Sequence, residues 1–237
     1  MTYLAFIHSP VLCAGILTLC LTPVSTLASG MVPDSPVVIV EAANGEGSIN
    51  VQNTDPYPVL LLTQLENIPE DTETLLTVTP PAARVEPGKR QSVRFLLTSK
   101  KLLKTERLKR VTFEGVPPQQ KDRSEVRMTV RQNLPVIIRP AELARDEAPW
   151  KHLVWQLVGK VLTVSNPSAY VVRLSQGVQT LPGNSIWMLP NSYVLPGQTL
   201  TLKQNGNKAP SSDTQVRISP ATTWGFSVDH YDALLVH

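Results

Sequence analysis

An alternating stretch at residues 123–140, RSEVRMTVRQNLPVIIRP, constrains the fold of this chain more than any other feature. Its even positions from 126 to 138 are apolar, with only Gln132 interrupting, and its odd positions are mostly polar or charged. A period of two over this length predicts a β-strand with one apolar and one polar face. Pro135 donates no ladder hydrogen bond, so its part of the strand is expected at an edge, an end or a bulge.

Two interpretations of this strand stay open at the level of the pattern. In the first, which the pattern alone favours, it is an ordinary sandwich strand with its apolar face in the core. In the second, it is an edge strand that offers its apolar side chains to another protein. The alternating stretch is also longer than an ordinary strand, since strands usually run about 3–10 residues. Part of it is therefore expected to project beyond its sheet or to bend at Pro135.

Residues 1–28 predict a cleaved secretory signal. An apolar run at residues 11–21 is followed by small residues, and the TLA at 26–28 fits a small-residue cleavage site. The apolar run is too short for a membrane-spanning helix, which needs about 20 residues; an uncleaved anchor is the alternative. Cys13 and Cys20 both lie in this segment. A mature chain would therefore have no disulfide framework, thiol nucleophile or cysteine metal site.

Short strands and turns fill the first half of the expected mature chain. Turn pairs such as Asn44-Gly45 and Pro87-Gly88 separate β-branched or apolar runs at 36–42, 47–53, 57–65 and 91–97. About seven short strands with regular turns in roughly 100 residues predict an immunoglobulin-like sandwich. We place this domain at residues 29–140.

The same pattern of short strands and turns resumes after a polar, proline-flanked linker that begins at residue 141. Turn signals such as Asn166-Pro167 and Pro196-Gly197 recur there. The strands expected in this second sandwich, at residues 141–237, are 153–158, 161–165, 170–174, 185–189, 200–203, 215–219 and 224–228. The predicted fold class is all-β, with two immunoglobulin-like domains.

The sequence offers little for catalysis or metal binding. After residue 28 the histidines are His152, His230 and His237, and none has the i, i+4 spacing of a helical metal site. No G-x-S-x-G elbow, P-loop or G-x-G-x-x-G is present. His230 beside Asp229 and Asp232 is better explained by an acidic turn than by a catalytic base. We therefore assign no catalytic residue, metal or cofactor, and the sequence argues against an enzyme.

Charge does not point to nucleic acid. The formal net charge of +3 is only mildly basic. The one basic cluster, KKLLKTERLK at residues 100–109, is interpreted as a solvated loop or short helix, with a patch for an acidic partner as the alternative.

Several motifs in order resemble the periplasmic chaperones of the chaperone–usher pilus pathway. The first domain of that family carries Thr-Pro-Pro, then Arg-(Val/Leu)-Glu-Pro-Gly, then a strand ending in Pro-Pro, then an alternating strand ending in Arg-Pro. The matching segments are 79–81, 84–88, 113–118 and 126–140. In the second domain, residues 162–172 resemble a strand, Asn-Pro-Thr turn and strand of the family. Within the family, the way this sequence differs from the usual pattern resembles that of the alternate-class chaperones that serve the common pilus.

The resemblance implies both an architecture and a function. Two immunoglobulin-like domains meet at an angle, and the last strand of the first domain completes a pilin subunit that lacks a strand. The donor side chains implied are Val126, Met128 and Val130, with Leu134 next on the same face. The partners implied are pilin or fimbrial subunits and an outer-membrane usher, and the location is the periplasm, without stable membrane insertion.

One departure concerns the terminal carboxylate of the subunit. The family holds it with an Arg on the first strand and a Lys four residues before the Arg-Pro, and these positions fall on Pro36 and Pro135. Either the alignment slips by a few residues, or this chain anchors its subunit differently. Candidate anchors are Arg131, Arg139 and Arg110. The alternative role of Arg139 is an interdomain salt bridge, and that of Arg131 is a solvated edge charge that discourages wrong pairing.

A structural fimbrial subunit or adhesin is the main alternative function, because it would also be a secreted protein built from β-sandwiches. Subunits normally carry an amino-terminal donor extension, and residues 29–35 are too short for one. A secreted carbohydrate-active enzyme is a further alternative, but it needs a pair of carboxylates that the sequence does not place.

Overall fold

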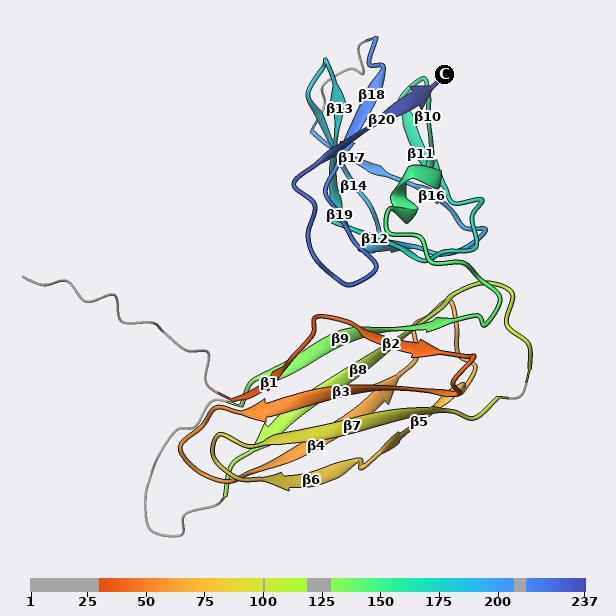
Figure 1. Cartoon of the computed structure of the whole chain (residues 1–237). Coiled ribbons are helices and arrows are strands. Elements are labelled where there is room, and N and C mark those ends of the chain that lie inside the picture. Colours follow the sequence, from red (N-terminus) through yellow and green to blue (C-terminus); the bar gives the residue numbers. More distant parts are fainter. Residues whose placement is uncertain (1–29, 100, 119–128, 207–211) are drawn as a thin grey trace, which may run out of the picture.

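The computed structural model describes residues 30–99, 101–118, 129–206 and 212–237. Two β-domains account for almost all of these residues, as Figure 1 shows. The predicted signal and two of the predicted donor residues, Val126 and Met128, lie outside the described residues.

The first domain is built from strands β1 to β9. Their bounds are β1 (Met31–Pro33), β2 (Val38–Glu41), β3 (Glu46–Asn53), β4 (Val59–Glu66), β5 (Leu76–Thr79), β6 (Ala82–Val85), β7 (Arg90–Leu97), β8 (Arg107–Val116) and β9 (Arg131–Arg139).

Strand β2 links the two layers of this domain. One hydrogen-bonded path, β5-β7-β3-β2-β9-β8-β4-β6, folds over on itself, and β1 joins it by pairing with β3. Strand β2 pairs with β3 at Glu41 and Glu46, and runs parallel to β9 over its four residues. Alternate side chains of the strands fill the core, among them Val40, Val51, Leu61, Val93, Phe95, Phe113, Val136 and Ile138. The predicted sandwich is confirmed.

The second domain begins with a 3-10 helix, η1 (Pro149–His152), and continues with strands β10 to β20. Their bounds are β10 (Val154–Val158), β11 (Val161–Ser165), β12 (Val172–Leu174), β13 (Gly177–Leu181), β14 (Ser185–Met188), β15 (Tyr193–Val194), β16 (Thr199–Thr201), β17 (Lys203–Asn205), β18 (Gln215–Ile218), β19 (Pro220–Ala221) and β20 (Tyr231–Val236).

An eight-stranded sheet and a three-stranded sheet enclose the second core. Their orders are β16-β11-β10-β20-β18-β13-β14-β17 and β15-β12-β19. Trp155 and Trp187 are fully buried between them. The all-β prediction with two sandwich domains is therefore confirmed for both halves of the chain.

Most predicted strands of the second domain match observed strands to within two residues at each end, but two predicted strands were wrong and four observed strands were not predicted. Segment 200–203 spans the break between β16 and β17. Strands β13, β15, β19 and β20 were not predicted. Segment 224–228 is not a strand but part of the connection between β19 and β20. Gly225 has a φ of 86° there, a left-handed conformation that turns the chain and that favours glycine.

The interpretation of residues 100–109 as a solvated loop or short helix was wrong for the residues from Arg107 onwards. Arg107 and Lys109 belong to β8, and the Lys109 side chain is only 3% exposed, with Nζ 2.9 Å from Asp71 Oδ1. Arg107 Nη2 lies 2.6 Å from the same carboxylate oxygen. Burial by itself would raise the pKa of Asp71, but the hydrogen bonds from Arg107 and Lys109 outweigh it and hold the pKa below its ordinary value. These cations stabilise the domain instead of forming a solvated patch.

The second domain stands on the first near β2, β8 and β9, and the long axes of the two domains are inclined to each other (Figure 1). A small apolar cluster lies at this joint. It contains Val37, Ile68, Leu108 and Ile137 from the first domain and Val171 from the second. The predicted angle between the domains is confirmed.

Candidate functional site

Strand β9 changes along its length from an inner strand to an edge strand. Its inner half (residues 136–139) is hydrogen-bonded to β8 on one side and, in parallel, to β2 on the other. Its edge half (residues 131–135) pairs with β8 alone among the described residues. The pairing with β2 begins only at Val38, and the nearby Pro36 has no N–H to donate. Each interpretation of the alternating stretch thus fits one half of the strand.

An open groove of about 300 Å³ runs beside the edge half of β9. Residues of the chain before β2 form one wall, and Gln132 and Leu134 form the other. Gln132 Nε2 reaches across and donates to the carbonyl oxygen of Met31 at 3.2 Å. Of the predicted donor residues, Val130 is 49% exposed just before β9, and Leu134 packs partly against the core. Among the described residues, this edge therefore combines a strand that pairs on one side only with an apolar groove.

Arg110 marks the part of the first domain that faces the second. It lies on β8 directly across from Pro135 in the antiparallel register. Its Nε donates to Asn133 Oδ1 at 2.6 Å and its Nη2 to the Asn133 carbonyl oxygen at 2.9 Å. No carboxylate among the described residues forms an ion pair with it. Burial lowers the pKa of Arg110, although the more distant Glu66 and Tyr193 act to raise it.

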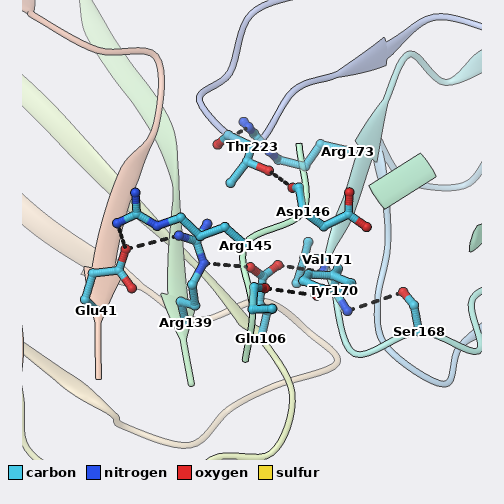
Figure 2. A network of polar contacts seen from close by, with 11 residues as sticks. Glu41, Glu106, Arg139, Arg145, Asp146, Ser168, Tyr170, Val171, Arg173 and Thr223 are labelled. Carbon is cyan, nitrogen blue, oxygen red and sulfur yellow. Dashed lines mark hydrogen bonds and ion pairs between the residues drawn. The ribbon is translucent and has the colours of Figure 1, made fainter. Parts of the chain in front are cut away.

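Arg139 is occupied in the joint between the domains. Its side chain is 2% exposed, with Nη1 3.1 Å from Glu41 Oε1 and Nε 3.3 Å from Glu106 Oε1 (Figure 2). The other oxygen of Glu106 accepts a hydrogen bond from the Val171 N–H at 2.9 Å, across the joint. Burial raises the pKa of Glu106 even though both of these contacts lower it. The geometry supports the salt-bridge interpretation of Arg139.

Arg131 is a surface residue. Its side chain is 61% exposed, and its Nη2 lies 2.7 Å from Glu114 Oε2 on the adjacent strand. The hydrogen bond from Arg131 to Glu114 raises the pKa of the guanidinium. Of the three predicted anchors, Arg110 therefore differs from both others, because it is half-buried and has no acidic partner among the described residues.

Arg173, on β12, is a further cation near this site that the sequence did not single out. Burial lowers its pKa, and the nearby charge of Arg110 lowers it further, while Glu106 acts in the opposite direction. Its Nη2 donates to the Thr222 carbonyl oxygen at 2.8 Å. The only sequence signal was a lone Arg within an apolar strand, VRL.

Asp232, one of the residues considered for catalysis, is bound by Arg217. Asp232 accepts two hydrogen bonds of 2.7 Å from Arg217, so its carboxylate is oriented by that guanidinium. The described residues contain no cluster of three potential metal ligands. They also contain no helix with the length and apolar character needed to cross a membrane.

The fold and this edge together define a class: a two-domain β-sandwich protein with an open strand, an apolar groove and a half-buried cation, features suited to holding another polypeptide chain. Residues 30–144 match the N-terminal domain of PapD, a pili and flagellar-assembly chaperone, and residues 148–231 match the C-terminal domain of the pili-assembly chaperone PapD. The chain belongs to this family of pilus-assembly chaperones.

Individual relatives agree with this assignment. The fimbrial chaperone YhcA of Escherichia coli (strain K12) is 41% identical over 211 residues, which cover 89% of this chain and 92% of YhcA. Caf1M of Yersinia pestis is 26% identical over 173 residues, 64% of this chain and 65% of Caf1M. The crystal structure of the Pseudomonas aeruginosa CupB2 chaperone has a TM-score of 0.69 at 22% identity, covering 86% of this chain and 100% of CupB2.

The structure of the Salmonella enterica SafA pilin in complex with the SafB chaperone gives a TM-score of 0.70 at 21% identity, covering 89% of this chain and 99% of the matched chain. Both structural similarities show the shared fold. The predicted resemblance is confirmed by the family matches. The protein is a pilus-assembly chaperone of the chaperone–usher pathway that binds fimbrial subunits, and the alternative of a fimbrial subunit or adhesin is not favoured.

Proposed function

We propose that this chaperone captures a pilin subunit along the edge half of β9 and completes the fold of the subunit with a row of apolar side chains. The donors are Val126, Met128 and Val130, with Leu134 next on the same face. The loss of the β2 partner before residue 136 carries the proposal. A pilin that lacks a strand exposes an edge and an apolar groove, and a donated strand supplies hydrogen bonds and side chains to both.

In this proposal the two halves of β9 have different roles, one in folding and the other in subunit binding. Val136 and Ile138 of the inner half are fully buried and hold the strand in its own domain. Val130 is half-exposed, so its burial in a subunit would contribute up to about 1.5–3 kcal/mol. Leu134 already packs partly against the core and has less to gain.

The terminal carboxylate of the subunit is assigned to Arg110. In relatives a lysine is expected at the position of Pro135, and Arg110 lies directly across from that position on the neighbouring strand. A guanidinium beside that position can bind a carboxylate through two hydrogen bonds. A carboxylate buried against the chaperone without a charged partner would cost several kcal/mol. Arg139 and Arg131 are already paired with acids, which leaves them less suited to this role.

The same proposal includes location and processing. Residues 1–28 direct export and are removed, which leaves a cysteine-free mature chain of two domains, 29–140 and 141–237, in the periplasm. The mature protein acts by binding alone and catalyses no reaction.

The experiment that tests strand donation is capture of a subunit during co-expression. The mature chain with an affinity tag is expressed with each of a panel of pilins, and stable one-to-one complexes are purified. Val130→Glu should abolish capture, because it would bury a charge in the apolar groove of the subunit. Val158→Glu is the matched control, since Val158 is 60% exposed on β10 of the second domain. Equal capture by Val130→Glu and wild type would refute the proposal.

A further inference from the structure

The connection between β19 and β20 reaches from the second domain to the groove beside β9. In Figure 1 this connection descends from the second domain towards the segment between β1 and β2. A Cβ atom added at Gly225 would lie 2.7 Å from the Cγ of Pro36 and 3.3 Å from a methyl group of Val37. Pro36 is itself part of the groove wall. The tip of this connection is therefore packed against one end of the groove.

Two aromatic side chains stand on either side of Gly225 at this tip. Trp224 is 43% exposed and lies under the guanidinium of Arg145, which is 5.6 Å from the ring centroid. Phe226 is 67% exposed. Contiguous exposed apolar surface is a typical feature of a protein-binding site.

Hydrogen bonds hold this tip in one conformation. Arg173 Nη2 donates to the carbonyl oxygens of Thr222 and Thr223, at 2.8 and 3.3 Å. Thr223 Oγ1 donates to the Asp146 carbonyl oxygen at 2.6 Å, a contact drawn in Figure 2. Within the turn, the Phe226 N–H donates to Thr222 Oγ1 at 3.1 Å. Because the turn is ordered before a partner arrives, docking on Phe226 costs little conformational entropy.

We propose that Phe226 is a second subunit contact, which packs on an apolar side chain among the last residues of the pilin strand held by β9. The inference rests on the proposed function, because its occupant is the same subunit. The register supplies the position: Val38 pairs with Val136 in parallel, so Pro36 lies about level with Leu134. Arg110 lies across from the next residue, Pro135.

This position determines the chemistry of the occupant. A pilin strand that pairs with the open edge of β9 as far as Leu134 has its final residues beside Pro36, next to the turn that carries Phe226. The groove there presents the Pro36 ring and the Leu134 side chain, and the exposed Phe226 follows Gly225, the residue that packs on Pro36. These apolar groups suit an aliphatic or aromatic side chain. Phe226 thus makes the second domain contribute to the choice of subunit.

The test measures release of a captured pilin, namely the pilin that co-purifies one-to-one with the wild-type chaperone. The labelled complex is mixed with an excess of unlabelled wild-type chaperone, and loss of label is followed. Phe226→Ser should release the pilin about tenfold faster, as truncation of a central aromatic contact does. Phe226→Leu should restore most of the retention. The control Leu234→Ser removes a side chain that is 78% exposed on β20 and should leave release unchanged.

A second arm uses the pilin with its last apolar residue changed to Ser. If Phe226 contacts that residue, Phe226→Ser should have no further effect in this background. Release from Phe226→Ser at the wild-type rate, while Val130→Glu still abolishes capture, would refute the contact and leave strand donation intact. Normal capture by Val130→Glu would instead refute strand donation itself. A change only in self-association of the free chaperone would mean that the loop contacts a second copy, which also overturns the proposal.

Discussion

The two halves of strand β9 have the same alternating pattern but different neighbours. The inner half lies between β2 and β8, and its apolar side chains are fully buried. The edge half has β8 on one side and the groove on the other. Sequence alternation thus determines which face of a strand is apolar. Whether neighbouring strands pair with both of its edges determines whether the strand stabilises its own domain or is available to a partner.

The largest expected difference in folding stability is between substitutions of the arginines at the two ends of β9. Arg139→Ala should lower the free energy of unfolding by about 3–5 kcal/mol, because it leaves Glu106 buried without its cation. Arg131→Ala should change it little, since that side chain is 61% exposed. Chemical denaturation of both variants measures the difference. Similar losses in the two variants would contradict the division of β9 into two halves.

The apolar side chains should show the same contrast at a slightly smaller scale. Ile138→Ala is expected to cost about 2–5 kcal/mol of folding stability, since it leaves a cavity in a closed core. Val130→Ala should leave the melting temperature of the free chaperone nearly unchanged, because Val130 is 49% exposed. Thermal unfolding of the free proteins, followed by subunit capture, separates the two. A large drop in stability for Val130→Ala would favour a core role for the edge half.

Arg110 sharpens the comparison on the polar face of the same sheet. Arg110→Ala should weaken subunit binding by about 10- to 100-fold, the scale of hydrogen bonds to a charged group, with little change in folding stability. Adding one residue to the carboxyl end of the pilin should remove most of this difference. Titration of wild type and variant with both pilins measures the coupling. If both pilins bind both chaperones equally, Arg110 is not the anchor.

The smallest expected effect is a pH dependence of the domain joint. Burial raises the pKa of Glu106 above its ordinary value of 4.5, so the folded state binds this proton more tightly than the unfolded state. The free energy of unfolding should therefore fall as the pH rises from about 4.5 through the raised pKa. Asp71 has a lowered pKa, so its contribution is lost only as the pH falls below 3.8. Melting temperatures of wild type and Glu106→Gln, measured from below pH 3.8 to neutral pH, test the Glu106 prediction. The same dependence of melting temperature on pH in both proteins would contradict it.

Local sequence patterns determined much of this protein. The period of two at residues 126–138 predicted the strand, and pairs such as Asn166-Pro167 and Pro196-Gly197 predicted the turns of the second domain. Motifs such as the Arg-Pro at its end led to the family. These signals succeed because strand alternation and turn dihedrals depend on neighbours within a few residues.

Tertiary structure alone decided which part of β9 is open and which of the three predicted arginines has no acidic partner among the described residues. Val38 and Val136 are far apart in the sequence, and their pairing closes one half of the strand. The same holds for Arg110, which takes its significance from the position of Pro135 on the neighbouring strand. The WGF sequence around Gly225 has the alternation of a strand, but its surroundings in the folded chain make it a turn. Periodicity carries no information about such partners, because burial and hydrogen-bond pairing arise between segments that the chain brings together only on folding.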